Sequence, residues 1–105
     1  IDSNEANVML QADPGSYVLI DVRRDDEWVT GHPTGAAHIP IDDLPGRIDE
    51  VPHDKKVMFI CAAGVRSGLA CEMAASMGYD SEKLFNVEDG VPTWMEGNHP
   101  TEFGE

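Results

Sequence analysis

The chain has 105 residues, a length that corresponds to one domain with a core of its own. Its formal net charge is −13, so the basic surface that phosphate groups require is missing and nucleic acid is not an expected partner. No apolar run approaches the ~20 residues of a membrane span, so no membrane association is expected.

The acidity leaves two interpretations open. A solvated, self-repelling surface is favoured, and attraction to a basic protein partner is the alternative. No secretion signal is expected, and two cysteines do not make a disulfide framework. Both thiols are expected to be reduced, which predicts a cytoplasmic location.

Short helices and strands alternate along the first half of the chain. Ile1 can begin an edge strand, and Ser3 is expected to cap a helix with Val8, Met9 and Ala12 on its apolar side. The elements expected next are a turn at 13–16, a buried parallel strand at 17–20, a short acidic helix at 25–29, a break at 31–35, a weak strand at 36–40 and a helical turn at 42–48 that Pro45 kinks or ends.

The second half is organised around Cys61. An apolar run at 57–60 is typical of a buried strand, and residues 67–77 are expected to form a helix that Gly78 stops. The expected apolar face of this helix consists of Leu69, Ala70, Met73, Ala74 and Met77. The elements expected after it are a strand at 84–87, a turn at 89–92, a short helix at 93–96 and a polar, frayed tail at 98–105. This alternation predicts an α/β fold with a parallel sheet, as a single domain over residues 1–105.

Cys61 therefore lies at the carboxyl end of a strand, where ligands bind in open α/β sheets. The loop that follows consists of Ala62, Ala63, Gly64, Val65, Arg66 and Ser67. Its amides and the start of the next helix favour negative charge, so the pKa of the Cys61 thiol is expected to be lowered and its thiolate to act as a nucleophile. Arg66 either holds an anionic donor or forms a structural ion pair with an acid such as Asp21.

Other reactive side chains receive structural interpretations. Asp21 and Arg23 either orient the loop or form a buried ion pair at the sheet edge, and the ion pair is favoured. Cys71 lies among small helical residues and is interpreted as a packing residue. The histidines have no ligand spacing, so neither a metal nor another cofactor is predicted. These histidines are His32, His38, His53 and His99.

Four segments, in order, resemble the motifs of the rhodanese family, the single-domain sulfurtransferases. Residues 19–23 resemble the opening L-I-D-V-R, and the stretch from Glu27 to Ala36 resembles E-[FWY]-x-x-G-H-I-x-G-A. Residues 61–67 resemble the active loop C-x-x-G-x-R-S, and residues from Gly90 to Gly97 resemble the closing G-G-x-x-x-W-x-x-x-G-x-P. The resemblance covers nearly the whole chain.

The resemblance implies an open parallel sheet of about five short strands flanked by helices on both faces. It also implies that Cys61 carries a persulfide, with residues 62–67 as the binding loop. Sulfur would move from thiosulfate or a persulfide donor to a thiol or cyanide acceptor. The intact cysteine argues against an inactive binding module.

Several residues depart from the family pattern. Pro33 and Thr34 replace the usual pair after the Gly-His, and Asp89 replaces the first closing glycine, which is expected to restrict that turn. Ala62 and Ala63 stand where many members carry basic or polar side chains. With the acidity, they favour the alternative of a persulfide carrier that receives sulfur from a basic protein partner and has little thiosulfate activity.

Loop length separates this chain from phosphatases. Tyrosine phosphatases, and the cell-cycle phosphatases that share the rhodanese fold, have five residues between cysteine and arginine, whereas four lie between Cys61 and Arg66 here. A shorter loop makes a smaller cradle, which suits a sulfur atom better than a phosphate. Phosphatase and arsenate reductase activities are therefore disfavoured.

Overall fold

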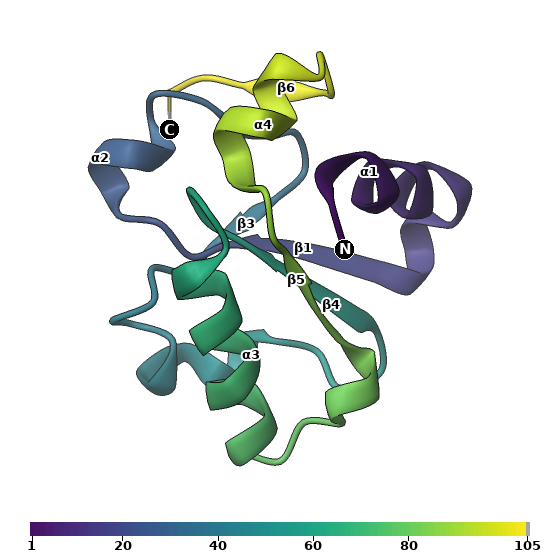
Figure 1. Ribbon diagram of the computed structural model, residues 1–105. Coiled ribbons are helices and arrows are strands. Elements are labelled where there is room, and N and C mark those ends of the chain that lie inside the picture. The colour runs from purple at the N-terminus through teal and green to yellow at the C-terminus, as the bar shows by residue number, and fades with distance from the viewer. Residues whose placement is uncertain (105) are drawn as a thin grey trace.

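The structure is a computed structural model that describes residues 1–104. Its centre is a parallel sheet of four strands in the order β3-β1-β4-β5 (Figure 1). The strands are β1 (Tyr17–Asp21), β3 (Ala37–His38), β4 (Lys56–Ile60) and β5 (Leu84–Val87). The middle strands β1 and β4 are the most apolar, as expected for strands that are covered on both faces.

Helices cover the two faces of the sheet (Figure 1). One face packs against α1 (Ser3–Ala12) and α4 (Gly90–Glu96), and the other against α3 (Val65–Ser76) and the 3-10 segment η2 (Pro45–Glu50). Shorter elements are α2 (Asp25–Trp28) and the 3-10 turns η1 (Pro14–Ser16) and η3 (Ser81–Lys83). The predicted α/β fold, with an open parallel sheet flanked on both faces, is confirmed.

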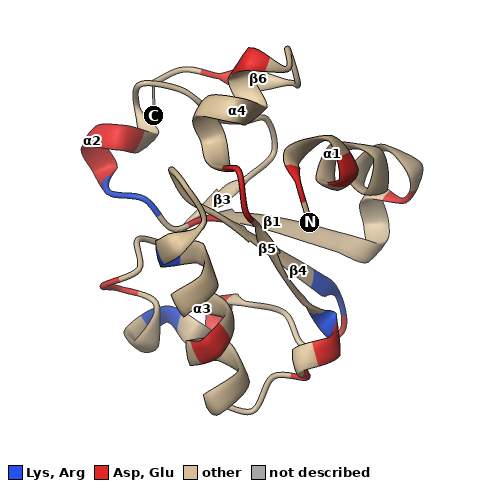
Figure 2. Ribbon diagram, viewed as in Figure 1, with Lys and Arg blue, Asp and Glu red and all other residues tan. Residues whose placement is uncertain are grey.

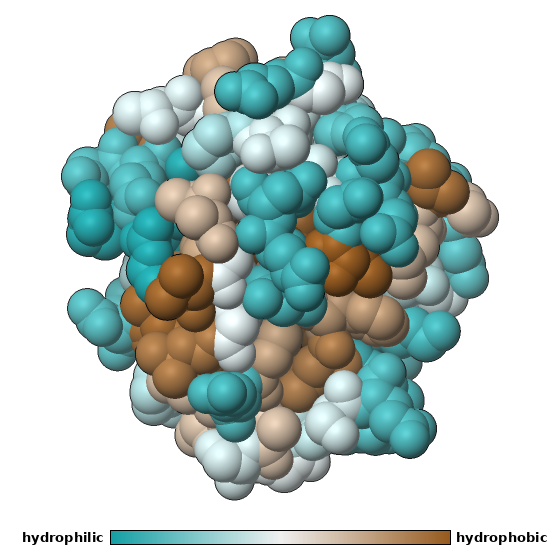
Figure 3. All heavy atoms as spheres, viewed as in Figure 1, coloured by the Kyte–Doolittle hydropathy of each residue, from teal (hydrophilic) through white to brown (hydrophobic). Residues whose placement is uncertain are grey.

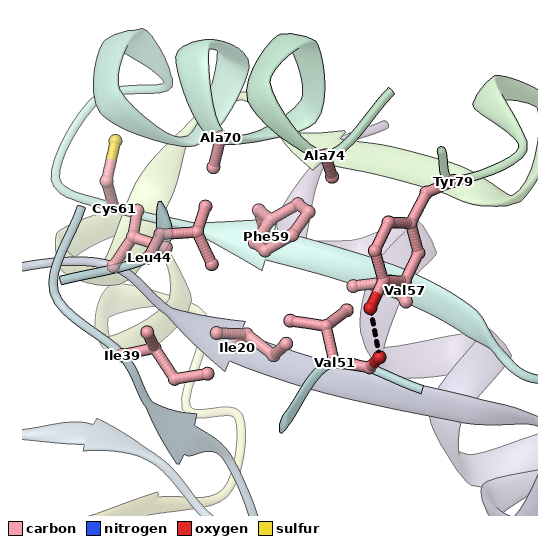
Figure 4. Close-up of a cluster of buried hydrophobic side chains, with 11 residues drawn as sticks. Ile20, Ile39, Leu44, Val51, Val57, Phe59, Cys61, Ala70, Ala74 and Tyr79 are labelled. Carbon is pink, nitrogen blue, oxygen red and sulfur yellow. Dashed lines mark hydrogen bonds between the residues drawn. The ribbon is translucent and has the colours of Figure 1, made fainter. Parts of the chain in front are cut away.

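Alternation along β4 divides the core into two clusters. Val57, Phe59 and then Cys61 point toward α3, whereas Met58 and Ile60 point toward α1 and α4. Figure 4 shows the first cluster, with Cys61 at its end beside Ala70. The site cysteine is thus an extension of the core, and packing of β4 against α3 fixes its position.

In place of the fifth strand that the resemblance implies, a single residue, Ile1, pairs with the edge of the sheet. Ile1 donates its amino group to the Asn86 carbonyl at 3.0 Å, and its own carbonyl accepts the Glu88 N–H at 2.9 Å. These two bonds lie on the outer edge of β5, where a further strand would pair. Within residues 1–104 the main sheet therefore has four strands.

The predicted cap of the first helix is wrong, and of its predicted apolar side only Met9 packs against the core. Asp2 caps α1, because its carboxylate accepts the Glu5 N–H at 2.8 Å and the Glu5 side chain reaches back to the Asp2 N–H. Ser3 is instead buried and bonded to Asp89, and Val8 is exposed.

The apolar face of α3 and the role of Pro45 also differ from expectation. Ala70 and Ala74 are buried and Met73 is partly buried, but Leu69 and Met77 are exposed. Small residues face the sheet because α3 lies close to β4 and β5. Pro45 begins η2, where its missing N–H costs nothing, rather than ending a turn.

The tail predicted as frayed contains a short strand. Thr101 and Glu102 form β6 (Thr101–Glu102), which pairs antiparallel with β2 (His32–Pro33) inside the segment predicted as a break. The Pro100 carbonyl accepts the Trp94 indole N–H and the Thr34 N–H, both at 2.9 Å. Residue 105 lies outside the described residues. None of the helices within residues 1–104 combines the length and apolar character that crossing a membrane takes.

Candidate active site

The Cys61 loop joins β4 to α3, as the sequence predicts. Strand β4 ends at Ile60, and α3 begins at Val65, two residues earlier than predicted. Gly64 precedes the helix with φ of 86°, and a Cβ there would lie 2.5 Å from the Glu88 carbonyl oxygen. Only glycine combines this left-handed backbone with such a close approach.

The start of α4 supports the loop from the other side. The Cys61 carbonyl accepts the Val91 N–H at 2.8 Å. Gly90 has φ of +77°, and a Cβ there would lie 2.0 Å from the Ala62 carbonyl oxygen. Asp89 has an ordinary right-handed backbone, so its substitution for the first closing glycine does not restrict the turn as expected.

The sulfur of Cys61 faces hydrogen-bond donors. The residue is only 1 % exposed, and its Sγ accepts the Gly64 N–H at 3.1 Å and lies 3.3 Å from the Ser67 hydroxyl oxygen. Burial alone would raise the pKa of the Cys61 thiol. Hydrogen bonds from the Ser67 hydroxyl and from the backbone N–H groups of Ser67, Ala63 and Gly64 outweigh burial, so the pKa is lowered. The inward-facing amides therefore stabilise a thiolate.

Arg66 is engaged by Glu27 of α2. Its guanidinium donates to both carboxylate oxygens, at 2.6 and 2.9 Å. The hydrogen bond from Arg66 brings the pKa of Glu27 down from 4.5 to about 2, against the opposing effect of burial. The structural interpretation of Arg66 thus has the right type of contact but the wrong partner, because the acid is Glu27 and not Asp21. The positive charge of the loop is compensated by this pair.

Asp21 and Arg23 form the buried ion pair that the sequence favours. The Arg23 Nη2 lies 2.8 Å from the Asp21 carboxylate and donates to the Gly31 carbonyl at 2.7 Å. Both side chains lie where β1 ends beside β4. The pair holds the segment around Gly31 against the sheet, and it makes no hydrogen bond to the Cys61 loop.

Asn86 on β5 belongs to the site, although no sequence motif indicates it. Its Nδ2 donates to the Gly64 carbonyl at 3.1 Å, and its Oδ1 accepts the Ser67 hydroxyl at 2.6 Å. The available signal was an amide inside the apolar run of β5, beside Phe59 in register. A polar residue at such a position requires partners.

The surroundings of Cys71 and of two of the histidines indicate packing roles. Burial raises the pKa of the Cys71 thiol to about 11, so Cys71 is a poor nucleophile. Trp28 stacks on His32 at 3.5 Å and on His38 at 4.5 Å between ring centroids. Within residues 1–104 no group of three or more His, Cys, Asp or Glu side chains is arranged to hold a metal ion.

The surface around the loop is apolar at the start of α3 and acidic above it. Val65 is 79 % exposed and Leu69 48 % exposed, and Figure 3 shows apolar surface in this part of the molecule. Figure 2 shows acidic residues along α2 and on the segment between β5 and α4. The loop therefore contributes Ala63 and Val65, together with Leu69 of α3, to an apolar patch, and two acidic segments lie near it.

Comparisons with known proteins agree with this geometry. The sequence model of the family described as the rhodanese-like domain matches residues 4–97. The chain belongs to the rhodanese-like family. It is similar to the Bacillus subtilis protein YtwF, with 38 % identity over 85 residues that cover 81 % of this chain and 79 % of the relative. It is also similar to an Allochromatium vinosum protein named sulfurtransferase, with 31 % identity over 100 residues that cover 95 % and 91 %.

Solved structures place the fold in the same family. A rhodanese-like domain protein from Staphylococcus aureus is 28 % identical and superposes with a TM-score of 0.84, covering 100 % of this chain and 97 % of that one. The resemblance read from the four sequence motifs is therefore confirmed at the level of family and fold.

Proposed function

We propose that this rhodanese-like domain is a sulfurtransferase that carries sulfane sulfur on Cys61. The names of its relatives support sulfur transfer in general. The observation that carries the proposal is the Cys61 sulfur itself, which lies at the carboxyl end of β4, accepts the Gly64 N–H and has a lowered pKa.

The reaction takes place in two displacements at sulfur. The Cys61 thiolate attacks the outer sulfur of thiosulfate, the S–S bond breaks with its electrons going to sulfite, and a cysteine persulfide remains. Cyanide or a thiolate acceptor then attacks the outer persulfide sulfur, and the thiolate of Cys61 leaves. The loop amides that stabilise the thiolate also stabilise the negative charge of the persulfide.

The same loop is poorly suited to phosphate. Only four residues separate Cys61 from Arg66, and both terminal nitrogens of Arg66 already bind Glu27. A phosphate would compete with that carboxylate for the guanidinium. The geometry thus supports a single sulfur atom as the bound group.

Thiocyanate formation from thiosulfate and cyanide tests the proposal. Cys61→Ser should abolish the activity, whereas the matched variant Cys71→Ser should retain it. Full activity of Cys61→Ser would refute the assignment of the nucleophile.

A second candidate function is a persulfide carrier that receives sulfur from a basic protein partner. It is supported by the net charge of −13, by the compensated charge of Arg66 and by the apolar patch beside the loop. A negative field repels thiosulfate and attracts a basic protein. We place either function in the cytoplasm, where Cys61 and Cys71 would remain reduced.

Kinetics with two donors distinguish the two functions. Rapid persulfide transfer from a cysteine desulfurase together with slow thiosulfate turnover favours the carrier. Efficient thiosulfate turnover at low salt favours the free enzyme.

A further inference from the structure

A closed ring of hydrogen bonds links the Cys61 loop to β5. Gly64 donates its N–H to Cys61 Sγ at 3.1 Å, and its carbonyl accepts the Asn86 Nδ2 at 3.1 Å. The Asn86 Oδ1 accepts the Ser67 hydroxyl at 2.6 Å, and the Ser67 oxygen lies 3.3 Å from Cys61 Sγ. The loop residues Cys61 and Gly64, Ser67 of α3 and Asn86 of β5 are thus linked around one sulfur atom.

The orientation of the Asn86 amide is fixed by this ring. Its Nδ2 faces the Gly64 carbonyl, which accepts hydrogen bonds only, so its Oδ1 must face Ser67. Reversing the amide would place two oxygens against each other. Asn86 therefore presents an acceptor, and only an acceptor, to the Ser67 hydroxyl.

Ser67 has one hydroxyl hydrogen and two neighbours that can accept it. When Cys61 is a thiol, its S–H donates to the Ser67 oxygen and the Ser67 hydrogen points to Asn86. When Cys61 is a thiolate, the sulfur only accepts, and the Ser67 hydrogen must turn to it. The Asn86 Oδ1 then loses its donor in a part-buried setting, which carries a cost.

We propose that Asn86 is a positioning residue that acts on Cys61 through Ser67, holding the hydroxyl hydrogen while the sulfur is protonated and releasing it when the sulfur is an anion. The thiol proton leaves to solvent, and the Ser67 hydrogen only rotates. The loop amides promote ionisation of the Cys61 thiol, and Asn86 opposes it. The inference rests on the proposed function, since sulfur transfer requires the anion.

Charged groups around the ring are paired or exposed, and the Ile1 ammonium group donates a hydrogen bond to the Asn86 backbone carbonyl at 3.0 Å. The pairs from the neighbouring elements are Glu27 of α2 with Arg66 of α3, Asp21 with Arg23 at the end of β1, and Asp89 before α4 with the N–H and hydroxyl of Ser3. Glu88, whose backbone approaches Gly64, has an exposed side chain. Cys61 is the group within the ring that titrates.

The test is the pKa of the Cys61 thiol, measured without any sulfur donor from thiolate absorbance and from the pH dependence of alkylation in a Cys71→Ser background. Asn86→Leu should lower the pKa by roughly 0.5 to 1 unit, because one hydrogen bond that favours the thiol is removed. Ser67→Ala should raise it. In a Ser67→Ala background, Asn86→Leu should have no effect.

Two results would overturn the proposal: a raised pKa in Asn86→Leu, which is what mere loosening of the loop produces, or an equal lowering with and without Ser67. If Asn86→Leu fails to fold, Asn86→Ala takes its place in the same comparison. The wild-type protein provides a further measurement, because the NMR signals of the Asn86 side-chain amide should shift over the pH range in which Cys61 titrates. Signals that stay constant through this range contradict the proposal. Because thiol ionisation is measured here and thiocyanate formation above, failure of one leaves the other intact.

Discussion

The ion pair between Glu27 and Arg66 stabilises the fold and also occupies the guanidinium that could bind an anionic sulfur donor. The substitution Glu27→Gln removes the charge of Glu27 and keeps nearly the same side-chain shape. The glutamine side chain still has an oxygen for the Arg24 N–H that Glu27 accepts at 3.2 Å. It removes the negative charge that lies 2.6 and 2.9 Å from the guanidinium. The change therefore leaves one uncompensated positive charge beside the Cys61 loop.

The pKa of Glu27 gives the size of the effect. A fall from 4.5 to about 2 corresponds to about 3 kcal/mol of folding free energy at 1.36 kcal/mol per pKa unit. The side chains of Arg66 and Glu27 are 27 % and 21 % exposed, so solvent screens part of this interaction. We expect Glu27→Gln to lower the free energy of unfolding at pH 7 by about 1–3 kcal/mol.

This loss depends on pH in one direction. The folded pKa of Glu27 lies below its unfolded value, so the pair stabilises the protein above about pH 4.5 and the stabilisation disappears as pH falls toward 2. The difference between wild type and Glu27→Gln should therefore be constant from pH 7 to 5. It should narrow between pH 4.5 and 3.

Urea denaturation across this pH range measures the difference. Glu50→Gln is the matched control, because its pair with Arg47 is exposed and should contribute nothing measurable. In the thiocyanate assay, Glu27→Gln should also lower KM for thiosulfate, because Arg66 becomes free to bind the dianion. A wild-type stability at pH 7, or a gap that widens on acidification, would refute the reasoning.

Further predictions concern the glycines and the two thiols. Gly90→Ala should lower the free energy of unfolding by more than about 2 kcal/mol and abolish activity, because position 90 combines a left-handed backbone with a clash at the Ala62 carbonyl. The control Gly35→Ala has the same kind of backbone but open space around it, so it should lower the free energy of unfolding by only about 1 kcal/mol. Thermal unfolding measures both. Iodoacetamide at pH 7 to 8 should alkylate Cys61 before Cys71, as peptide mass spectrometry will show; preferential labelling of Cys71 would contradict the assigned pKa directions. An aryl phosphate should not be hydrolysed, and turnover dependent on Cys61 would overturn the inference from loop length.

The central part of the site could be predicted because it depends on local sequence. Apolar runs at 17–20 and 57–60 are long enough to identify β1 and β4, and parallel strands place Cys61 at the ligand-binding edge. The direction of the Cys61 pKa follows from its place on a loop that opens a helix. Both conclusions need only neighbours in the chain.

The contacts that tune the site depend on residues far apart in the sequence. Arg66 and Glu27 are 39 residues apart, and an acid-rich chain offers many equally plausible partners. Asn86 is a single polar residue in a strand, and nothing in its immediate neighbours shows that it meets Ser67 and Gly64. Only the order of strands brings these side chains together.

Two misjudged segments have similar causes. β6 has two residues and exists because it pairs with β2 across about 70 residues of chain. In α3, hydrophobicity predicted Leu69 and Met77 as core, but the close approach of the helix to the sheet selects Ala70 and Ala74. Tertiary packing overrides the local pattern in both segments.

Mass spectrometry of the Cys61 peptide after incubation with thiosulfate or a persulfide donor tests the sulfur-carrying role most directly. We predict an added mass of about 32 Da on the Cys61 peptide, reversed by cyanide, with the Cys71 peptide unchanged. An unmodified Cys61 peptide with every donor, or an added sulfur found only on Cys71, would contradict the proposed function.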